Sequence, residues 1–155
     1  MKKYIAILLL LGTAWPVTAM AAASCTIVRS AGNILANFGS YDAMSGPRDS
    51  IGQVSFTCVP DALLGVPVSY SVAASPGNSG SYSQRRLQSG AYGLNYNLYL
   101  DPSRLQVFGD GSPGTSKSAG ICAAACVVPV YGRLSGGQTV PAGTYQDSIL
   151  VTLEF

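Results

Sequence analysis

The stretch Gln53-Val54-Ser55-Phe56-Thr57-Cys58 alternates polar and apolar residues at every position. Successive side chains of a β-strand point to opposite faces, so its second, fourth and sixth residues are expected on one buried face. The same alternation returns over Tyr92–Leu100 and over Tyr145–Phe155. No stretch keeps a helical apolar period for three turns, and these segments therefore predict half-buried strands.

Val66–Val72 alternates in the same way. Shorter strands are expected around these segments, at Cys25–Arg29, Ile34–Phe38, Leu105–Phe108 and Val127–Leu134. Turns rich in glycine, proline and asparagine separate them. Seven or eight short strands with such punctuation predict an all-β fold, a single β-sandwich over residues 24–155, with a closed barrel as the alternative. The inward side chains of the final strand are expected to be Ile149, Val151, Leu153 and Phe155.

The composition excludes several classes of chemistry. The 155 residues include no histidine, which removes Ser-His-Asp and Cys-His catalysis, histidine metal ligands and imidazole acid–base catalysis. Hydrophobic residues make up 48% of the chain and charged residues 10%, a balance that argues against disorder. The formal charge of +2 is too small to predict binding to nucleic acid.

Residues 1–23 are typical of a secretory signal peptide. Two lysines precede an apolar run over Ile5–Leu11, and small residues favour cleavage after Ala23, with cleavage after Ala21 as the alternative. The run is too short to span a bilayer, so we expect export without membrane insertion. Loss of the two lysines leaves seven basic and seven acidic residues, a neutral mature chain. A lipoprotein signal before Cys25 is the rival interpretation, but Ala22 stands where such signals usually carry a bulky aliphatic residue.

Four cysteines allow three pairings, and export favours disulfide bonds. Cys25 lies in the first strand and Cys58 ends the alternating strand, so a bond between them would join the first strand to the second hairpin. Cys122 and Cys126 are separated by three residues, enough to close a small loop. We favour these two pairs. Zinc is the alternative, but zinc sites usually carry two closely spaced pairs, and we expect neither a metal nor a cofactor.

Three motifs that could carry chemistry stand in contexts that do not support it. Gly109–Gly114 matches G-x-G-x-x-G, but the helical pattern that dinucleotide binding requires does not follow. Asp101 and Asp110 could form a glycosidase pair, yet each stands in a common turn dipeptide. Arg85-Arg86 is too short for a nucleic-acid patch and is expected in a solvated loop. We therefore predict that the chain is not an enzyme.

Several short segments follow one another in a characteristic order. They are Phe38-Gly39-Ser40-Tyr41, Val54–Cys58, Arg86-Leu87, Leu94–Tyr99 with Asp101, Phe108–Gly111, Val130–Arg133 and Ala142–Asp147. Together they resemble the spore coat protein U domain family, whose better-understood members are subunits of archaic, Csu-type chaperone–usher pili. The segments cover nearly the whole mature chain, and Cys122 and Cys126 are an addition to the family pattern.

The resemblance implies an immunoglobulin-like sandwich that lacks its last strand and exposes a hydrophobic groove. A periplasmic chaperone would first lend a strand, and a neighbouring subunit would later replace it. The implied partners are this chaperone, an outer-membrane usher and neighbouring pilus subunits, and the implied route leads through the periplasm to the cell surface. Ile149, Val151, Leu153 and Phe155 would form part of the groove; the alternative is an ordinary core in a complete sandwich.

A departure from the family pattern concerns the donor segment, which in this family precedes the first cysteine. Cleavage after Ala23 leaves only Ser24 before Cys25, whereas a strand that fills a groove needs roughly ten residues. We therefore expect a subunit that accepts a strand but donates none, at a fibre tip or outside the shaft. The alternative functions are a self-contained extracellular adhesin or carbohydrate-binding module and, with less support, a hydrolase.

Overall fold

The computed structural model describes residues 22–28, 35–61 and 65–155. The expected signal peptide over residues 1–23 therefore lies almost wholly outside the described residues, as do Arg29 and Ile34, each at one end of an expected strand. Within the described ranges, no helix is long and apolar enough to cross a membrane.

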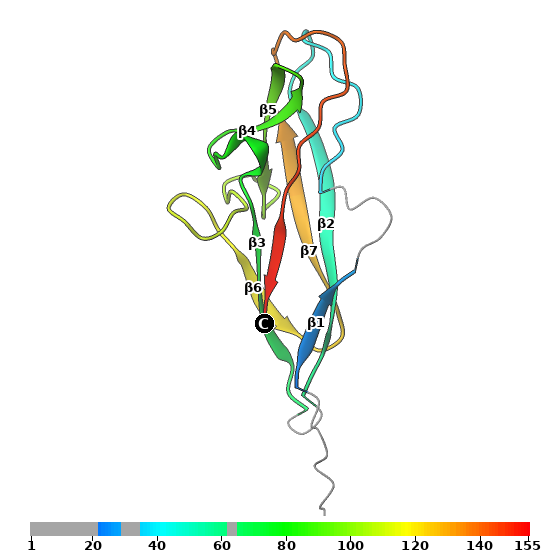
Figure 1. The fold of residues 1–155 in the computed structure, drawn as a ribbon, viewed down its shortest axis with the longest axis vertical. Helices are drawn as coiled ribbons and strands as arrows, with labels where there is room; N and C mark the ends of the chain where they lie inside the picture. The colour runs from blue at the N-terminus through cyan, green and yellow to red at the C-terminus, as the bar shows by residue number, and fades with distance from the viewer. Residues whose placement is uncertain (1–21, 29–34, 62–64) are drawn as a thin grey trace, which may run out of the picture.

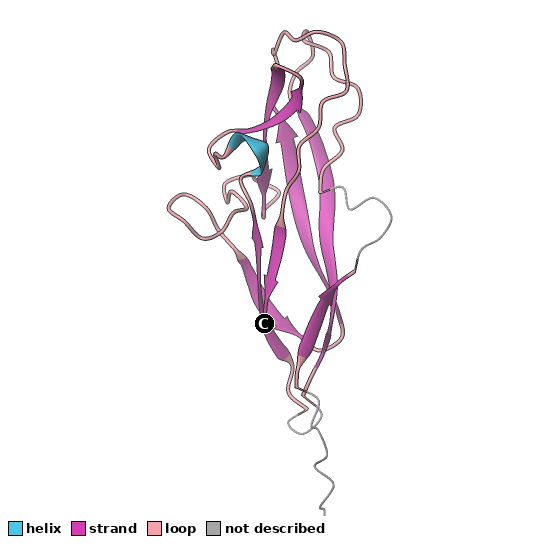
Figure 2. Cartoon of the chain, in the orientation of Figure 1, coloured by secondary structure: helices cyan, strands magenta, loops and turns pink. Residues whose placement is uncertain are grey.

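Strands dominate the structure (Figures 1 and 2). In chain order the elements are β1 Ser24–Ile27, β2 Arg48–Val59, β3 Val68–Ala74, the 3-10 turn η1 Gly77–Ser79, β4 Arg85–Ser89, β5 Tyr92–Tyr99, β6 Ser118–Cys122, β7 Ala125–Leu134 and β8 Val151–Glu154. They form two antiparallel sheets, one in the order β1-β2-β7-β5-β4 and one in the order β6-β3-β8. Because the sheets are separate and share one core, the predicted sandwich is confirmed and the closed barrel is excluded.

The alternating stretch in β2 supplies the centre of that core. Val54, Phe56 and Cys58 are 5%, 0% and 2% exposed. On the opposite sheet, Tyr70 meets Phe56 edge to face, with 4.7 Å between the ring centroids. Burying a side chain of this size contributes roughly 1.5–3 kcal/mol. The alternating stretch 53–58 therefore supplies the residues around which the two sheets pack.

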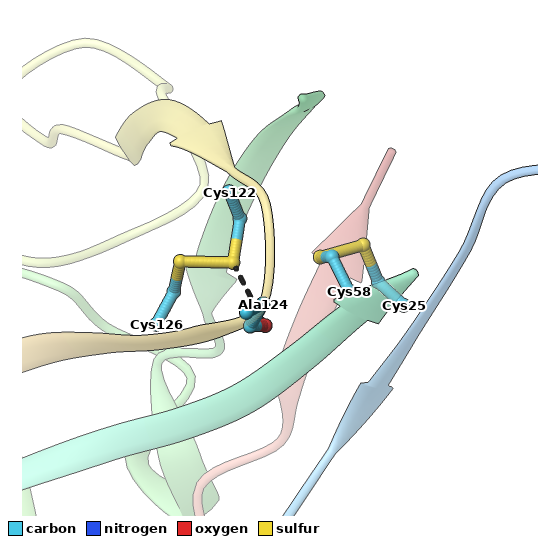
Figure 3. Close-up of a disulfide and its surroundings, with 5 residues drawn as sticks. All are labelled: Cys25, Cys58, Cys122, Ala124 and Cys126. Atoms are coloured by element: carbon cyan, nitrogen blue, oxygen red, sulfur yellow. Dashed lines mark hydrogen bonds between the residues drawn. A yellow bond between two sulfur atoms is a disulfide. The ribbon is translucent and has the colours of Figure 1, made fainter. Parts of the chain in front are cut away.

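Both favoured disulfides are present (Figure 3). Cys25 and Cys58 are directly opposite each other in the β1–β2 ladder. Cys122 ends β6 and Cys126 lies in β7, so the second bond joins the two sheets. The backbone N–H of Cys58 donates to the carbonyl of Ala124, at 2.8 Å, which ties the two disulfides together.

Some expected strands are shorter than predicted or missing. The described part of Ile34–Phe38 forms no strand, and β3 begins only at Val68, after Pro67, whose nitrogen carries no hydrogen to donate to a ladder. Leu105–Phe108 forms only isolated bridges, at its last two residues. The expected final strand over 145–155 is regular only within β8, and its first half crosses from one sheet to the other.

The expectation that Arg85 lies in a solvated loop is wrong. Arg85 begins β4 and is 0% exposed. Its Nη2 donates to the carbonyls of Ser75 and Phe108, at 2.8 and 2.7 Å. The ring of Tyr82 lies 5.2 Å from its guanidinium carbon. Burial lowers the pKa of Arg85, and the surrounding neutral oxygens allow this cation to stay inside because they satisfy its donors.

Candidate binding groove

A groove of about 990 Å³ opens between two segments that are far apart in the sequence. One rim is the segment 35–43, and the other is the segment 138–149 that leads into β8 (Figure 1). The floor is made by inward side chains of β4, β5 and β7. These are Leu87, Leu94, Tyr96, Leu98 and Leu134. The groove is thus an opening onto the apolar core.

The first rim lies against the sheet because a glycine leaves room for it. A Cβ on Gly132 of β7 would come within 2.8 Å of the Cβ of Ala36 and 3.0 Å of the ring of Phe38. Phe38 meets Tyr96 edge to face at 5.8 Å, and the N–H of Asn37 donates to Oγ of Ser50 at 2.8 Å. This rim is therefore held by packing and side-chain bonds, without a strand ladder.

The second rim is held by backbone bonds to both sheets. Gln146 exchanges two hydrogen bonds with Gln88 of β4, at 2.8 and 3.1 Å. Four residues later the carbonyl of Leu150 accepts from the N–H of Ser75, at 2.8 Å, just beyond the end of β3. The segment between these points spans the opening between the sheets, which explains why it forms no regular strand.

A hydrogen bond between the rims closes one end of the groove. The backbone N–H of Gln138 donates to the hydroxyl of Tyr41, at 2.6 Å. The Gln138 side chain bonds the backbone of Asn95 on β5 in both directions, at 2.7 and 3.1 Å. Among the described strands, β1 pairs only with β2 and β8 pairs only with β3, so each lies at an edge of its sheet. Such an edge has backbone groups with which an extended segment could pair.

A polar contact interrupts the apolar floor. The hydroxyl of Tyr96 donates to Oδ2 of Asp147, at 2.7 Å. Burial raises the pKa of Tyr96, and the bond to Asp147 raises it further. Oδ1 of the same carboxylate accepts the backbone N–H groups of Asn78 and Ser148, at 2.9 and 2.8 Å. The second rim is therefore anchored to the groove floor by a charged group.

Of the four residues expected in the groove, only Ile149 lines it. Val151 and Leu153 on β8 are half-buried against the core and are not part of the groove lining. Phe155 follows β8 and is 59% exposed, so its expected inward orientation is not seen. The sequence did not predict the first rim as part of the site, although Phe38–Tyr41 is one of the segments on which the family resemblance rests.

The other candidate sites resolve into turns. Two oxygens of Asp101 accept the N–H groups of Leu105 and Gln106, and Asp110 accepts the N–H of Ser112. The glycine motif over 109–114 is followed by β6 instead of a helix. All four cysteines are in disulfides, and the described residues contain no group of three potential metal ligands.

A solved structure shares this fold. One chain of the CsuC–CsuE chaperone–tip adhesion subunit pre-assembly complex, from archaic chaperone–usher Csu pili of Acinetobacter baumannii, is 20% identical and superposes with a TM-score of 0.53. The match covers 86% of this chain and 40% of that chain, so the present chain spans less than half of its solved relative.

The sequence comparisons are more specific. The model of the Spore Coat Protein U domain matches residues 13–152. Protein U of Myxococcus xanthus is 31% identical over 140 residues, which cover 85% of this chain and 78% of the relative. The chain belongs to the spore coat protein U domain family, and the resemblance noted from the sequence is confirmed.

Proposed function

We propose that the chain is an exported structural subunit of a pilus or coat, and that it is assembled by accepting a β-strand into the groove. The groove carries this proposal, because its floor is formed by side chains of the apolar core, and because β1 and β8 each pair with only one other described strand. An added strand would satisfy the free backbone groups of those edges and cover the apolar floor. The family and the shared fold support a structural role over a catalytic one.

The proposed partners follow from this way of assembly. A periplasmic chaperone would lend the first strand, an outer-membrane usher would exchange it, and a neighbouring subunit would supply the final one. The signal peptide over residues 1–23 would direct the chain to the periplasm, from which it would reach the cell surface. With cleavage after Ala23, the subunit would accept a strand without donating one.

Self-complementation tests the acceptor role. The full chain is extended beyond Phe155 by a flexible linker and a strand of alternating valine and threonine, which can fold back antiparallel to β8. We expect the extended chain to be recovered as a monomer without a chaperone and to melt higher than the unextended chain. The unextended chain should need a co-expressed chaperone. If it is instead a stable monomer with the same melting temperature, a self-contained binding module is supported.

Two neighbouring residues provide a matched pair of variants. Ile149 lines the groove, whereas Leu150 is 70% exposed. Ile149→Asp should abolish capture of the chaperone or of the appended strand, because it places a charge where an apolar side chain must be covered. Leu150→Asp adds the same charge outside and should leave capture unchanged. Equal loss in both variants would argue against the groove as the binding site.

A further inference from the structure

One charged residue interrupts the apolar stripe of the second rim. From 145 to 153 the half-buried positions alternate with exposed ones, as in a strand with one face inward. The half-buried positions hold Tyr145, Asp147, Ile149, Val151 and Leu153. Asp147 thus occupies a position that the alternation reserves for an apolar side chain.

Asp147 is held in the groove by neutral donors only. Its partners are the hydroxyl of Tyr96 and the N–H groups of Asn78 and Ser148. Among the described residues, Asp147 forms no ion pair with a lysine or an arginine; the ion pairs present involve Asp49 and Glu154. The nearby cation Arg85 donates instead to the oxygens of Ser75, Asn97 and Phe108. Each carboxylate oxygen can accept about two hydrogen bonds, so Oδ2 retains capacity for one more donor.

The charge around the groove is of one sign. Its described lining includes two carboxylates, Asp42 and Asp147, and no lysine or arginine. Asp42 belongs to a turn on the first rim, where its Oδ1 accepts the N–H of Met44 at 3.0 Å. Asp147 is the carboxylate at a half-buried position, where a new ion pair would be screened less by water.

Resting on the proposed acceptor role, we propose that the donor strand of a neighbouring subunit carries a basic side chain that pairs with Asp147. An alternating apolar strand can shift by two residues without changing which face is buried, so apolar contacts alone define its register weakly. One charge pair at a defined position excludes the shifted registers, because each of them leaves the carboxylate facing an apolar side chain. A strand that stays in an assembly needs one register, which is why we assign the basic residue to a neighbouring subunit.

The test uses the full chain carrying the appended valine–threonine strand. Each inward valine of that strand is replaced in turn by lysine or by glutamate, and the melting temperature is measured. We expect one position at which lysine melts higher than glutamate by about 5 °C, since an ion pair replaces a like-charge contact. Asp147→Asn should remove this difference while keeping an oxygen for Tyr96. Asp42→Asn should leave it intact.

The outcomes separate this inference from the proposed function. If even the all-apolar strand fails to raise the melting temperature, the acceptor role itself fails. If the apolar strand stabilises but lysine never exceeds glutamate, or if the difference survives in Asp147→Asn, only the ion pair is refuted. A second measurement compares recovery of a co-expressed periplasmic chaperone by the wild-type chain and by Asp147→Asn. Equal recovery supports the assignment to a neighbouring subunit, whereas loss of the chaperone overturns it.

Discussion

Nη1 of Arg85 donates a 2.6 Å hydrogen bond to Oδ1 of Asn97, and both side chains are buried. Asn97 also donates from Nδ2 to the carbonyl of Tyr82, at 2.8 Å. The pair therefore connects β4 and β5 to the segment that follows β3. A buried cation held by neutral oxygens is stable only while every donor and acceptor is matched.

Removing this cation should destabilise the fold strongly. Arg85→Met leaves the carbonyls of Ser75 and Phe108 without the guanidinium donors, while Oδ1 of Asn97 keeps only the N–H of Leu98. We expect the free energy of unfolding of the strand-extended chain to fall by about 3–5 kcal/mol, because each buried unsatisfied group costs about 1–3 kcal/mol. Denaturant unfolding measures the change. Arg86→Met, at the exposed neighbouring position, should change it by less than about 0.5 kcal/mol.

The two disulfides should contribute unequally. Cys25 and Cys58 are 33 positions apart in the sequence, whereas Cys122 and Cys126 are four positions apart. In the chain-entropy model, loss of the longer loop closure costs about 4 kcal/mol and loss of the shorter one about 2 kcal/mol. The double variants Cys25→Ala/Cys58→Ala and Cys122→Ala/Cys126→Ala can be compared by thermal unfolding. A larger loss in the second variant would show that joining the two sheets matters more than loop length.

The hydrogen bond that closes one end of the groove should be lost when the Tyr41 hydroxyl is removed. Tyr41→Phe deletes the acceptor for the N–H of Gln138 while keeping the ring. We expect a loss of about 1 kcal/mol in unfolding free energy and faster hydrogen exchange at that amide. Tyr92→Phe removes a hydroxyl at an exposed position and serves as the control. Unchanged exchange at Gln138 in Tyr41→Phe would mean that the bond does not hold the rims together.

One carboxylate should titrate at unusually low pH. Hydrogen bonds from the side chain and backbone of Ser112 lower the pKa of Asp110 to about 2, against roughly 3.9 in an unfolded chain. The ionised form is therefore favoured by folding, so its contribution is present above pH 4 or so and is lost as the pH falls through the folded pKa. NMR titration of the carboxyl carbon should show a midpoint near 2. Ser112→Ala should raise it, and an unshifted midpoint in the wild-type chain would contradict this account.

The mature N-terminus decides whether the chain can donate a strand. Intact-mass measurement of the exported protein should show cleavage after Ala23, one residue before Cys25. Such a chain should accept a donor peptide and yet fail to complement a second copy. Cleavage well upstream of Met20 would leave enough residues for a donor strand and would remove the basis for an acceptor-only role.

Strands could be predicted from the sequence where one face of the strand is buried and the other is more exposed, because such a strand alternates apolar and polar residues. β2 and β5 each have a buried and a less buried face, so their alternation was visible, and the two cysteine pairs were assigned from spacing and export. β4 was missed because its inward position holds Arg85, whose charge is matched by residues from three other segments. A strand was predicted over residues 34–38, but packing against Gly132 holds the first rim without a ladder.

By itself, the sequence determined the all-β class and the family, since these depend on local alternation and ordered motifs. It favoured one disulfide pairing of three, which the structure shows. Only the tertiary structure decided that the segment 35–43 faces the segment 138–149 across an open groove. It also decided that Arg85 is buried and that Asp147 points to Tyr96. These features depend on contacts between residues that are distant in the chain. The local alternation of apolar and polar residues does not show which oxygens accept hydrogen bonds from Arg85 or which strand lies at the edge of a sheet.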